Sequence, residues 1–159
     1  MDQTISAVPD QTLVPSCSQR PNRRRSRPPC VLIVDDSADV RLLWRVALTL
    51  GGFAVGEAAN GVEALAKAVA DFPDVIVMDL CMPVMSGVEA ARALKGDART
   101  ANTPVIGVTA HVGSPVTREF QRFCHEVLEK PVCPDLLHAA LSRAMRSAGT
   151  ADASQLRRA

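Results

Sequence analysis

Aromatic residues are scarce in this chain of 159 residues: they make up 3% of it, and tyrosine is absent. Hydrophobic residues nevertheless reach 47% and charged residues 22%, which is an ordinary globular balance. The core must therefore be aliphatic. The length favours one domain with terminal tails over two full domains.

Long apolar segments are also missing. No run approaches the roughly 18 residues that a membrane-spanning helix needs. The amino terminus, Met1-Asp2-Gln3, lacks the basic-then-apolar order of a secretory signal. We therefore expect a cytoplasmic protein without a membrane span.

Paired cysteine motifs are absent as well. The five cysteines, at positions 17, 30, 81, 124 and 133, are odd in number and contain no C-x-x-C pair. This pattern indicates neither a disulfide framework nor a zinc site. We therefore expect free, reduced thiols.

The two ends of the chain differ in composition from its middle. Residues 1–29 hold five prolines and five arginines against two acids, show no regular period, and are expected to form a disordered tail. No aromatic residue is interleaved to stack on bases, so a solvated tail is favoured over a site for nucleic acid, anionic lipid or an acidic partner. Small residues from Ser147 onward predict a second flexible tail, 147–159, which leaves residues 30–146 as the domain.

Strand-like and helix-like patterns alternate five times between these tails. The expected strands are residues 30–34, 53–58, 74–79, 104–109 and, more weakly, 126–130. The expected helices cover residues 40–50, 62–69 and 87–95, one begins at Ser114-Pro115, and one begins at Pro134-Asp135 and carries Leu137, Leu141 and Met145. Such alternation predicts an α/β fold with a doubly wound parallel sheet and helices on both faces.

The first helix has an apparent apolar stripe. Val40, Leu43, Ala47 and Leu50 recur at steps of three and four residues and predict the buried face. Trp44 is also expected in the core. Asn60 is a candidate cap for the second helix.

Polar residues stand at the carboxyl ends of the expected strands: Asp35, Asp36, Asp79, Thr109 and Lys130. Ligands bind at that edge of open α/β sheets, where the strand order reverses. If the order is 2-1-3-4-5, the first and third strands are neighbours and the three carboxylates converge. Like charges this close resist joint ionisation, and a hard divalent cation relieves the conflict. Magnesium suits such a site because it prefers oxygen ligands.

The same residues are sufficient for phosphoryl transfer, which needs positioning and charge neutralisation more than covalent chemistry from the protein. Asp79 would be the nucleophile and form an acyl phosphate. Lys130 would pair with Asp79 at rest and with a phosphoryl oxygen later. Thr109 supplies a hydroxyl donor.

Four ordered motifs resemble those of response regulator receiver (CheY-like) domains. They are Val-Asp-Asp at 34–36, Met-Asp-Leu-Cys-Met-Pro-Val-Met-Ser-Gly at 78–87, Val-Thr-Ala at 108–110 and Lys-Pro at 130–131. The resemblance covers about residues 29–146 and is far more specific than any single motif. It implies a flavodoxin-like (βα)5 three-layer sandwich with strand order 2-1-3-4-5.

The resemblance also implies residue roles. Asp79 is then the phosphoacceptor, and Mg²⁺ is held by Asp36, with Asp35 assisting, together with Asp79 and the backbone carbonyl of Cys81. Thr109 is the switch hydroxyl and Lys130 the lysine of the family pattern, followed by a cis peptide bond to Pro131. One departure matters, because the family often has an aromatic residue three positions before the lysine and this chain has Val127.

The resemblance implies a histidine kinase or histidine phosphotransfer protein as donor. It implies no enzyme activity beyond the domain's own phosphorylation and dephosphorylation. No output domain follows residue 146, which predicts signalling to a protein effector in trans. The alternative is a receiver-like interaction module that works without phosphorylation.

Two other classes on similar sheets fit less well. A phosphatase of the haloacid dehalogenase type would need a second aspartate at position 81, which is cysteine. A flavodoxin would need a Ser/Thr/Gly phosphate loop after the first strand, where this chain has Asp-Asp-Ser-Ala-Asp.

Overall fold

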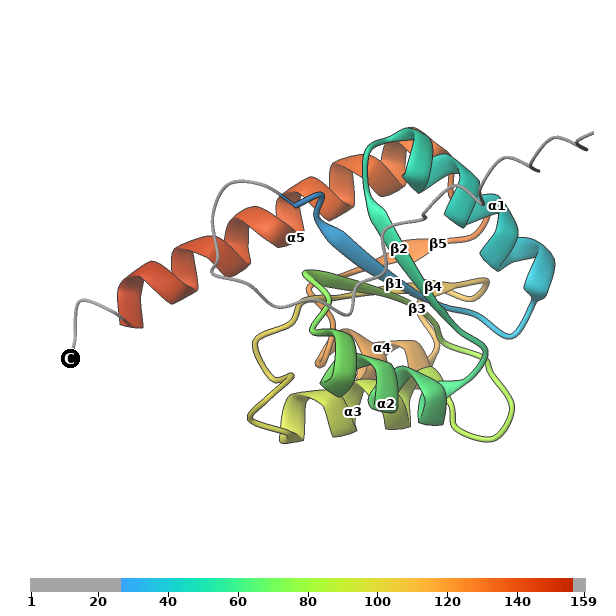
Figure 1. The fold of residues 1–159 in the computed structure, drawn as a ribbon. Coiled ribbons are helices and arrows are strands. Elements are labelled where there is room, and N and C mark those ends of the chain that lie inside the picture. Colours follow the sequence, from blue (N-terminus) through green and yellow to red (C-terminus); the bar gives the residue numbers. More distant parts are fainter. Residues whose placement is uncertain (1–26, 156–159) are drawn as a thin grey trace, which may run out of the picture.

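A five-stranded parallel sheet forms the centre of the molecule, in the order β2-β1-β3-β4-β5 (Figure 1). The structure, a computed structural model, describes residues 27–155. The strands are β1 (Cys30–Val34), β2 (Ala54–Ala58), β3 (Val75–Asp79), β4 (Val105–Thr109) and β5 (Glu126–Glu129). All four neighbouring pairs are parallel, which confirms the predicted doubly wound sheet and its strand order.

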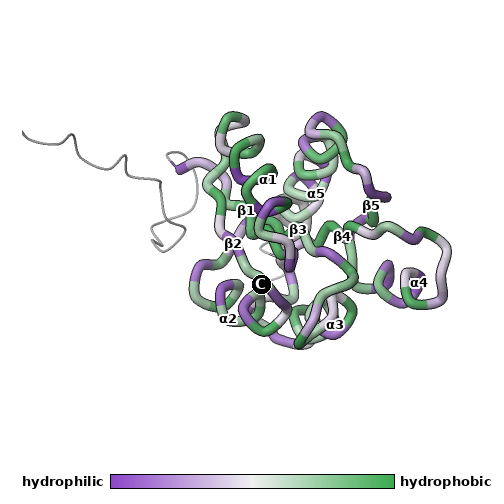
Figure 2. Tube along the Cα trace, turned by 90° about the vertical axis from the view of Figure 1, so that its right-hand side faces the viewer, coloured by the Kyte–Doolittle hydropathy of each residue, from purple (hydrophilic) through white to green (hydrophobic). Residues whose placement is uncertain are grey.

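Five helices connect the strands and cover both faces of the sheet. They are α1 (Ala38–Leu50), α2 (Gly61–Asp71), α3 (Gly87–Gly96), α4 (Pro115–Gln121) and α5 (Pro134–Gln155). One core cluster joins the sheet to α1 and α5, and a second joins it to α2, α3 and α4. Figure 2 shows these two helical layers on either side of the strands. Every residue of β1, β3 and β4 is buried, as expected for central strands with both faces covered.

Short polar side chains fix where four of the helices begin. Ser37, Asn60, Ser86 and Ser114 each accept a hydrogen bond from a backbone N–H in the first turn. The predicted cap at Asn60 and the predicted start of a helix at Ser114-Pro115 are thereby confirmed. Ser86 and Glu89 form a reciprocal capping box, so the start of α3 beside the end of β3 is firmly defined.

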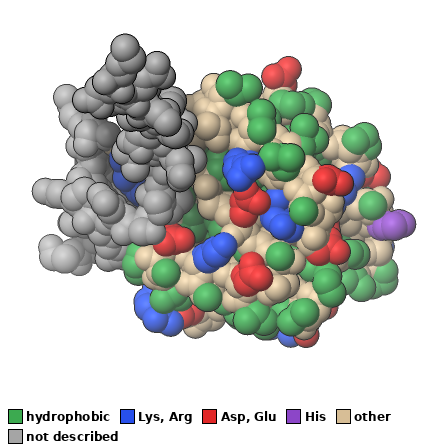
Figure 3. Space-filling model, turned by 45° about the vertical axis from the view of Figure 1, so that its right-hand side comes forward, with side chains coloured by type: hydrophobic (Ala, Val, Ile, Leu, Met, Phe, Trp, Pro, Cys, Tyr) green, Lys and Arg blue, Asp and Glu red, His purple; other side chains and the backbone are tan. Residues whose placement is uncertain are grey.

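The face that α1 buries differs from the predicted one. Trp44 and Leu48 are buried, and the core position of Trp44 is confirmed. The predicted stripe is wrong at its two leucines, because Leu43 is 62% exposed and Leu50 84% exposed. Figure 3 shows hydrophobic side chains, in green, at the surface on this side of the molecule. Nearly every position of α1 is apolar or amphipathic, so spacing alone could not choose between two overlapping stripes.

Helix α5 runs further than expected. Leu137 and Leu141 are buried, as predicted, but the helix continues to Gln155, past the expected domain boundary at 146. The flexible tail expected from residue 147 is therefore helical up to Gln155. Alanine at 148, 151 and 153 favours this, since adding residues to an existing helix costs little and alanine is the best helix former.

The thiols agree with expectation at three positions. Cys81, Cys124 and Cys133 are free. Cys30 is disulfide-bonded, so the expectation of a free thiol is wrong there. Spacing carried no signal for this, because the bonded residue lies outside any recognisable cysteine motif. The expectation for Cys17 lies outside the described residues.

The described structure begins at the end of the expected amino-terminal tail. Arg27 forms an ion pair with Asp74, with 3.2 Å between its guanidinium nitrogen and the carboxylate oxygen. The other four tail arginines and the expected disorder of residues 1–26 lie outside the described residues. Within residues 27–155, no helix has the length and apolarity needed to cross a membrane.

Candidate functional site

Three carboxylates meet at the carboxyl ends of β1 and β3. The two strands pair in register, with Val34 beside Met78, so Asp35 and Asp36 follow β1 next to Asp79 at the end of β3. One oxygen from each carboxylate lies within 4.8 Å of the others. Asp35 and Asp79 are buried, whereas Asp36 is exposed. The sheet thus brings together the three acids that the sequence singled out.

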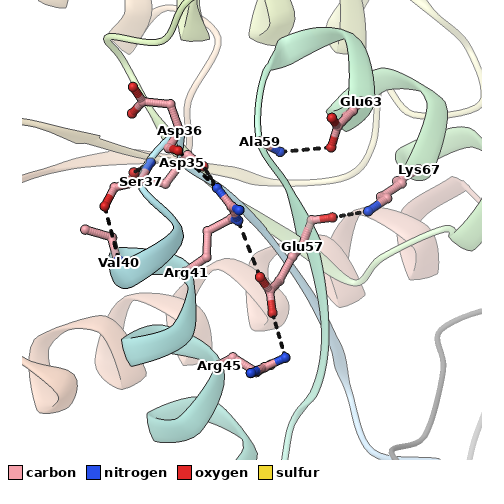
Figure 4. Close-up of polar contacts among 10 residues, drawn as sticks. All are labelled: Asp35, Asp36, Ser37, Val40, Arg41, Arg45, Glu57, Ala59, Glu63 and Lys67. Atoms are coloured by element: carbon pink, nitrogen blue, oxygen red, sulfur yellow. Dashed lines mark hydrogen bonds and ion pairs between the residues drawn. The ribbon is translucent and has the colours of Figure 1, made fainter.

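The backbone around Asp35 and Asp36 is held by hydrogen bonds from two directions (Figure 4). The N–H of Ser37 donates to Asp35 Oδ1 over 2.9 Å, which orients the carboxylate. The guanidinium of Arg41 donates to the carbonyl of Asp35 over 2.7 Å and to that of Asp36 over 3.2 Å. The sequence did not predict this role of Arg41.

Arg41 is itself fixed by a carboxylate on the neighbouring strand. Its Nε lies 3.4 Å from Glu57 Oε2, and Arg45 approaches the other oxygen of Glu57 at 3.3 Å. Glu57 belongs to β2, which pairs with β1, so the acid turn is tied to the sheet through α1 (Figure 4). The only sequence signal was an arginine in the second turn of a helix that starts directly after two acids.

Lys130, the residue directly after β5, contacts the acid cluster. Its Nζ lies 3.2 Å from Asp35 Oδ2 and 3.2 Å from Asp79 Oδ1. The backbone N–H of Lys130 donates to the Thr109 carbonyl over 2.8 Å, and the peptide bond to Pro131 is cis. The lysine side chain is 33% exposed, so a ligand arriving from solvent can reach its ammonium group.

Burial and charge oppose each other at these residues. Burial raises the pKa of Asp79, and neighbouring Asp35 adds to this, while Lys130 and the backbone of Cys81 act in the lowering direction without cancelling it. For Lys130, burial acts to lower the pKa, but attraction to Asp79 and Asp35 outweighs it, so the pKa is raised. The site therefore carries more negative charge than one ammonium neutralises.

Thr109 ends β4 beside the cluster. Thr109 is 1% exposed, and its hydroxyl oxygen accepts a hydrogen bond from the N–H of His111 over 3.1 Å. Within the described part of the chain, no acceptor is recorded for the hydroxyl hydrogen. This hydrogen is therefore available to a ligand oxygen.

The loop after β3 approaches the backbone of Asp79 closely. A Cβ atom at Gly87 would lie 2.2 Å from the Asp79 carbonyl oxygen, so only glycine fits there. In the same loop, Val84 has a left-handed backbone φ of 71°, which is rare for a β-branched residue. Cys81 is exposed, and its carbonyl stays a predicted metal ligand.

The donor set fits a hard divalent cation. All three side chains offer carboxylate oxygens, which Mg²⁺ prefers, and the exposure of Asp36 leaves room for the waters that Mg²⁺ keeps. The raised pKa of Asp79 points the same way, because a cation would relieve the carboxylate repulsion that helps to raise it.

Comparison with known families agrees with this geometry. The profile of the response regulator receiver domain matches residues 31–142. The phosphate regulon transcriptional regulatory protein PhoB of Pseudomonas aeruginosa is 36% identical over 77% of this chain. A protein-glutamate methylesterase/protein-glutamine glutaminase of Hahella chejuensis is 49% identical over 55% of it. The chain covers 54% of the first relative and 25% of the second, so the activities of the complete relatives do not transfer.

Solved structures show the same fold. The chemotaxis response regulator CheY4 of Vibrio cholerae has a TM-score of 0.69 and 35% identity, and the match covers 74% of this chain and 98% of that one. The response regulator domain of Thermotoga maritima CheB has a TM-score of 0.67 and 31% identity, covering 76% and 98%. The similarity therefore spans these domains almost from end to end.

Proposed function

The chain belongs to the response regulator receiver family, and on that premise we propose that it accepts a phosphoryl group on Asp79 from a phosphohistidine donor. Receiver domains are generally signalling modules of two-component systems and not enzymes in their own right. The observation that carries the proposal is the convergence of Asp79 with two further acids and Lys130 at one sheet edge. A cluster of three carboxylates and one ammonium group suits an incoming phosphoryl group, because a cation held by the acids and the ammonium group can both pair with its oxygens.

Asp79 acts as the nucleophile. A carboxylate oxygen of Asp79 forms a bond to phosphorus while the bond from phosphorus to the donor imidazole nitrogen breaks, which leaves an acyl phosphate on Asp79. Burial of Asp79 keeps this carboxylate poorly solvated, so little water has to be removed before attack. The capping box of α3 and the close contact at Gly87 hold the strand end in place during the reaction.

Lys130 balances the charge before and after transfer. At rest its ammonium is shared by Asp35 and Asp79, each 3.2 Å away. When Asp79 becomes phosphorylated, one of these contacts is free to pass to a phosphoryl oxygen. Such a charge-assisted hydrogen bond is stronger than a neutral one and is suited to the developing negative charge.

Asp35, Asp36 and Asp79 would hold Mg²⁺, with the Cys81 carbonyl as a further ligand. When bound, the ion would neutralise carboxylate and phosphoryl oxygens and lower the repulsion between them. Arg41 and Ser37 serve this set indirectly, because they fix the backbone and the carboxylate of the acid turn. Thr109 donates its hydroxyl hydrogen to a phosphoryl oxygen after transfer.

The partners follow from this chemistry. The donor is a histidine kinase or a histidine phosphotransfer protein, and the acceptor of the signal is a protein effector in trans. We assign the output surface to α4, β5 and α5, which adjoin Thr109 and Lys130. The proposed location of this exchange is the cytoplasm.

The test is phosphorylation of the intact chain by a small-molecule phosphodonor, followed by mass spectrometry. We expect a gain of one phosphoryl group that requires Mg²⁺ and is lost in Asp79→Asn. Asp97→Asn is the matched control, since Asp97 is an aspartate at the opposite end of the sheet, after α3. A full gain of mass in Asp79→Asn would refute the assignment of the acceptor.

Two other outcomes would replace the proposal. No gain of mass with Mg²⁺ present would leave the chain as an interaction module that works without phosphorylation. Repeated turnover of an organic phosphate would indicate a phosphatase.

A further inference from the structure

A cavity opens at the amino ends of β4 and β5, at the end of the sheet opposite to Asp79. The loop before β4, the loop before β5 and the turns of α5 around residue 146 form its walls (Figure 1). Its volume is about 310 Å³, which lies at the lower end of the range of small-molecule sites. Three of the described residues that line it have basic side chains, Lys95, Arg122 and His125, and none of them is an aspartate or glutamate.

The carboxylates on the flanking elements are already paired with other arginines. Glu119 of α4 pairs with an arginine of α3, and Glu126 of β5 accepts hydrogen bonds from Arg143 over 3.0 and 2.7 Å. Within residues 27–155, neither Lys95 nor Arg122 forms an ion pair with a carboxylate. The positive charge of the cavity is therefore not neutralised by a neighbouring acid.

The thiol of Cys124, which also lines the cavity, does not supply the missing negative charge. Burial raises its pKa to about 12, although Lys95 acts in the opposite direction, so the thiol is protonated at neutral pH. The ammonium group of Lys95 donates to the carbonyls of Ala101 and Thr103, which carry no full charge. An anion in the cavity would meet positive charge that no described protein group cancels.

Each basic residue by itself has an ordinary explanation. Lys95 lies in the last turn of α3 and Arg122 directly follows α4, and cations near the carboxyl end of a helix interact favourably with its dipole. Gathering both of them with His125 around one cavity is different, because like charges that lie close together repel each other. A bound anion removes this repulsion.

Backbone hydrogen bonds hold the donors in place before a ligand arrives. The N–H of His125 donates to the Val105 carbonyl over 2.7 Å, and the N–H of Arg122 donates to the Glu119 carbonyl over 3.1 Å. The guanidinium group of Arg122 offers a planar pair of donors that matches phosphate oxygens, and an imidazole ring has an N–H donor in either protonation state. Asn102, from the loop before β4, adds an amide donor.

We propose that this cavity binds a small phosphate-bearing anion, with Arg122 and His125 as its direct contacts. Lys95 keeps its carbonyl partners and contributes positive charge from the wall. A phosphate group suits the cavity better than a carboxylate, because it has more terminal oxygens for the several donors and more negative charge for the basic groups. Phe123 and Ala148 add apolar surface, so a phosphate monoester fits as well as inorganic phosphate. Ala148 lies beyond the expected domain boundary at 146, so the continuation of α5 completes the site.

The test is a titration of the isotope-labelled chain with inorganic phosphate, at constant ionic strength and without Mg²⁺, followed by amide chemical shifts. We expect saturable shifts in the loop before β5, with a dissociation constant on the order of 1 mM, which is within reach of so small a ligand. Arg122→Gln should weaken binding by about tenfold or more, because a charge-assisted hydrogen bond is lost. Arg118→Gln is the matched control, since Arg118 is an exposed arginine of α4 that donates to the Gly113 carbonyl outside the cavity.

A second variant places a negative charge inside the cavity. Ala148→Glu adds a carboxylate beside the basic groups and should abolish the phosphate-dependent shifts. Ala139→Glu is the matched control, because Ala139 is exposed on the same helix and does not line the cavity, so this variant should bind as the unmodified chain does. The amide spectra of both variants also report whether the fold is kept.

Titration with glycerol phosphate identifies the source of the phosphate group. A lower dissociation constant than that of inorganic phosphate would indicate a monoester as the ligand, and an equal one would indicate that the phosphate group alone is recognised.

Three results would overturn the proposal. They are shifts that do not saturate, equal affinities in Arg122→Gln and the unmodified chain, and loss of binding in Asp79→Asn, which would place the anion at the other end of the sheet. Failure of the proposed function would leave these titrations unchanged, because they need neither a phosphodonor nor Mg²⁺.

Discussion

Two partly buried lysines lie near opposite ends of the parallel strands, and their pKa values are shifted in opposite directions. Lys130, at the carboxyl edge, contacts Asp35 and Asp79, and its pKa is raised. Lys95, in the last turn of α3, donates to the carbonyls of Ala101 and Thr103 over 3.0 and 2.8 Å. Burial lowers the pKa of Lys95, and the nearby Cys124 opposes this only weakly.

The contrast shows how burial changes the pKa of a lysine with and without charged partners. Carbonyl oxygens satisfy the hydrogen bonds of an ammonium group but bring no full charge, so the cost of desolvating Lys95 stays visible in its pKa. At the carboxyl edge, two carboxylates offset that cost, and the excess negative charge leaves a place for a cation. Lys95 therefore ties a loop to a helix, whereas Lys130 pairs with two acids of the proposed phosphorylation site.

The strongest test of the contrast between Lys130 and Lys95 removes the charge of each lysine in turn. Lys130→Met should slow phosphorylation of Asp79 by about 10²-fold or more, as expected for loss of a preorganised positive group. Lys95→Met should leave the rate unchanged. The rates are measured as the time course of mass gain with a small-molecule phosphodonor and Mg²⁺. Equal rates in the two variants would place Lys130 outside the reaction.

The gain in unfolding free energy that Mg²⁺ provides should depend on the acids at the carboxyl ends of the strands and not on Lys95. If the three acids bind the ion, Mg²⁺ at about 100 times its dissociation constant should raise the free energy of unfolding by ~2.7 kcal/mol. Lys95→Met should show the same increment, because its site is remote. Asp36→Asn should show a clearly smaller one. The measurement is urea unfolding with and without Mg²⁺, and an increment unaffected by Asp36→Asn would move the ion elsewhere.

The sequence predicted that the three acids meet at the carboxyl ends of β1 and β3, as it predicted the strand order. Runs such as 30–34 and 74–79 have the length of buried strands, and parallel pairing then forces Asp35 and Asp79 to one edge. Arg41 was missed, because its role depends on Glu57 in a neighbouring strand. The packing of Phe120 of α4 over Gly107 of β4 was missed too. Nothing in the local sequence indicates that Gly107 faces α4.

The helix face of α1 marks another limit of sequence reasoning. Leu43 and Leu50 have the spacing of a buried stripe, yet Trp44 and Leu48 are the buried residues. The choice depends on how α1 rotates against β1 and α5, which is decided by packing and not by period. The disulfide at Cys30 is similar, because pairing depends on distances that spacing does not contain.

The structural role of Lys95 predicts a loss of stability without loss of chemistry. Lys95→Met keeps the side-chain stem but leaves the carbonyls of Ala101 and Thr103 without their donor, which should cost about 2 kcal/mol. Urea unfolding with an unchanged slope would measure it. Arg122→Met is the control, because Arg122 is an exposed cation lining the same cavity as Lys95, and it should change stability by less than about 0.5 kcal/mol. Equal losses of unfolding free energy in the two variants would contradict the proposal that Lys95 stabilises the loop before β4.

The smallest expected effect concerns the charge of Asp79 itself, and its sign is unusual. Because burial raises the pKa of Asp79, the folded protein holds the proton more tightly than the unfolded chain does. The stability that this provides is present at low pH and is lost as the pH rises through the folded pKa.

At pH 7 without Mg²⁺ the carboxylate therefore destabilises the fold, and Asp79→Asn should raise the free energy of unfolding by about 1 kcal/mol. The advantage should shrink as the pH falls through the raised folded pKa of Asp79, because the wild-type carboxyl then takes up its proton. Urea unfolding at a series of pH values from neutral to acidic measures this difference. A loss of stability in Asp79→Asn at pH 7 would mean that pairing with Lys130 outweighs burial, and the carboxyl edge would then resemble an ordinary ion pair more than a site prepared for a cation.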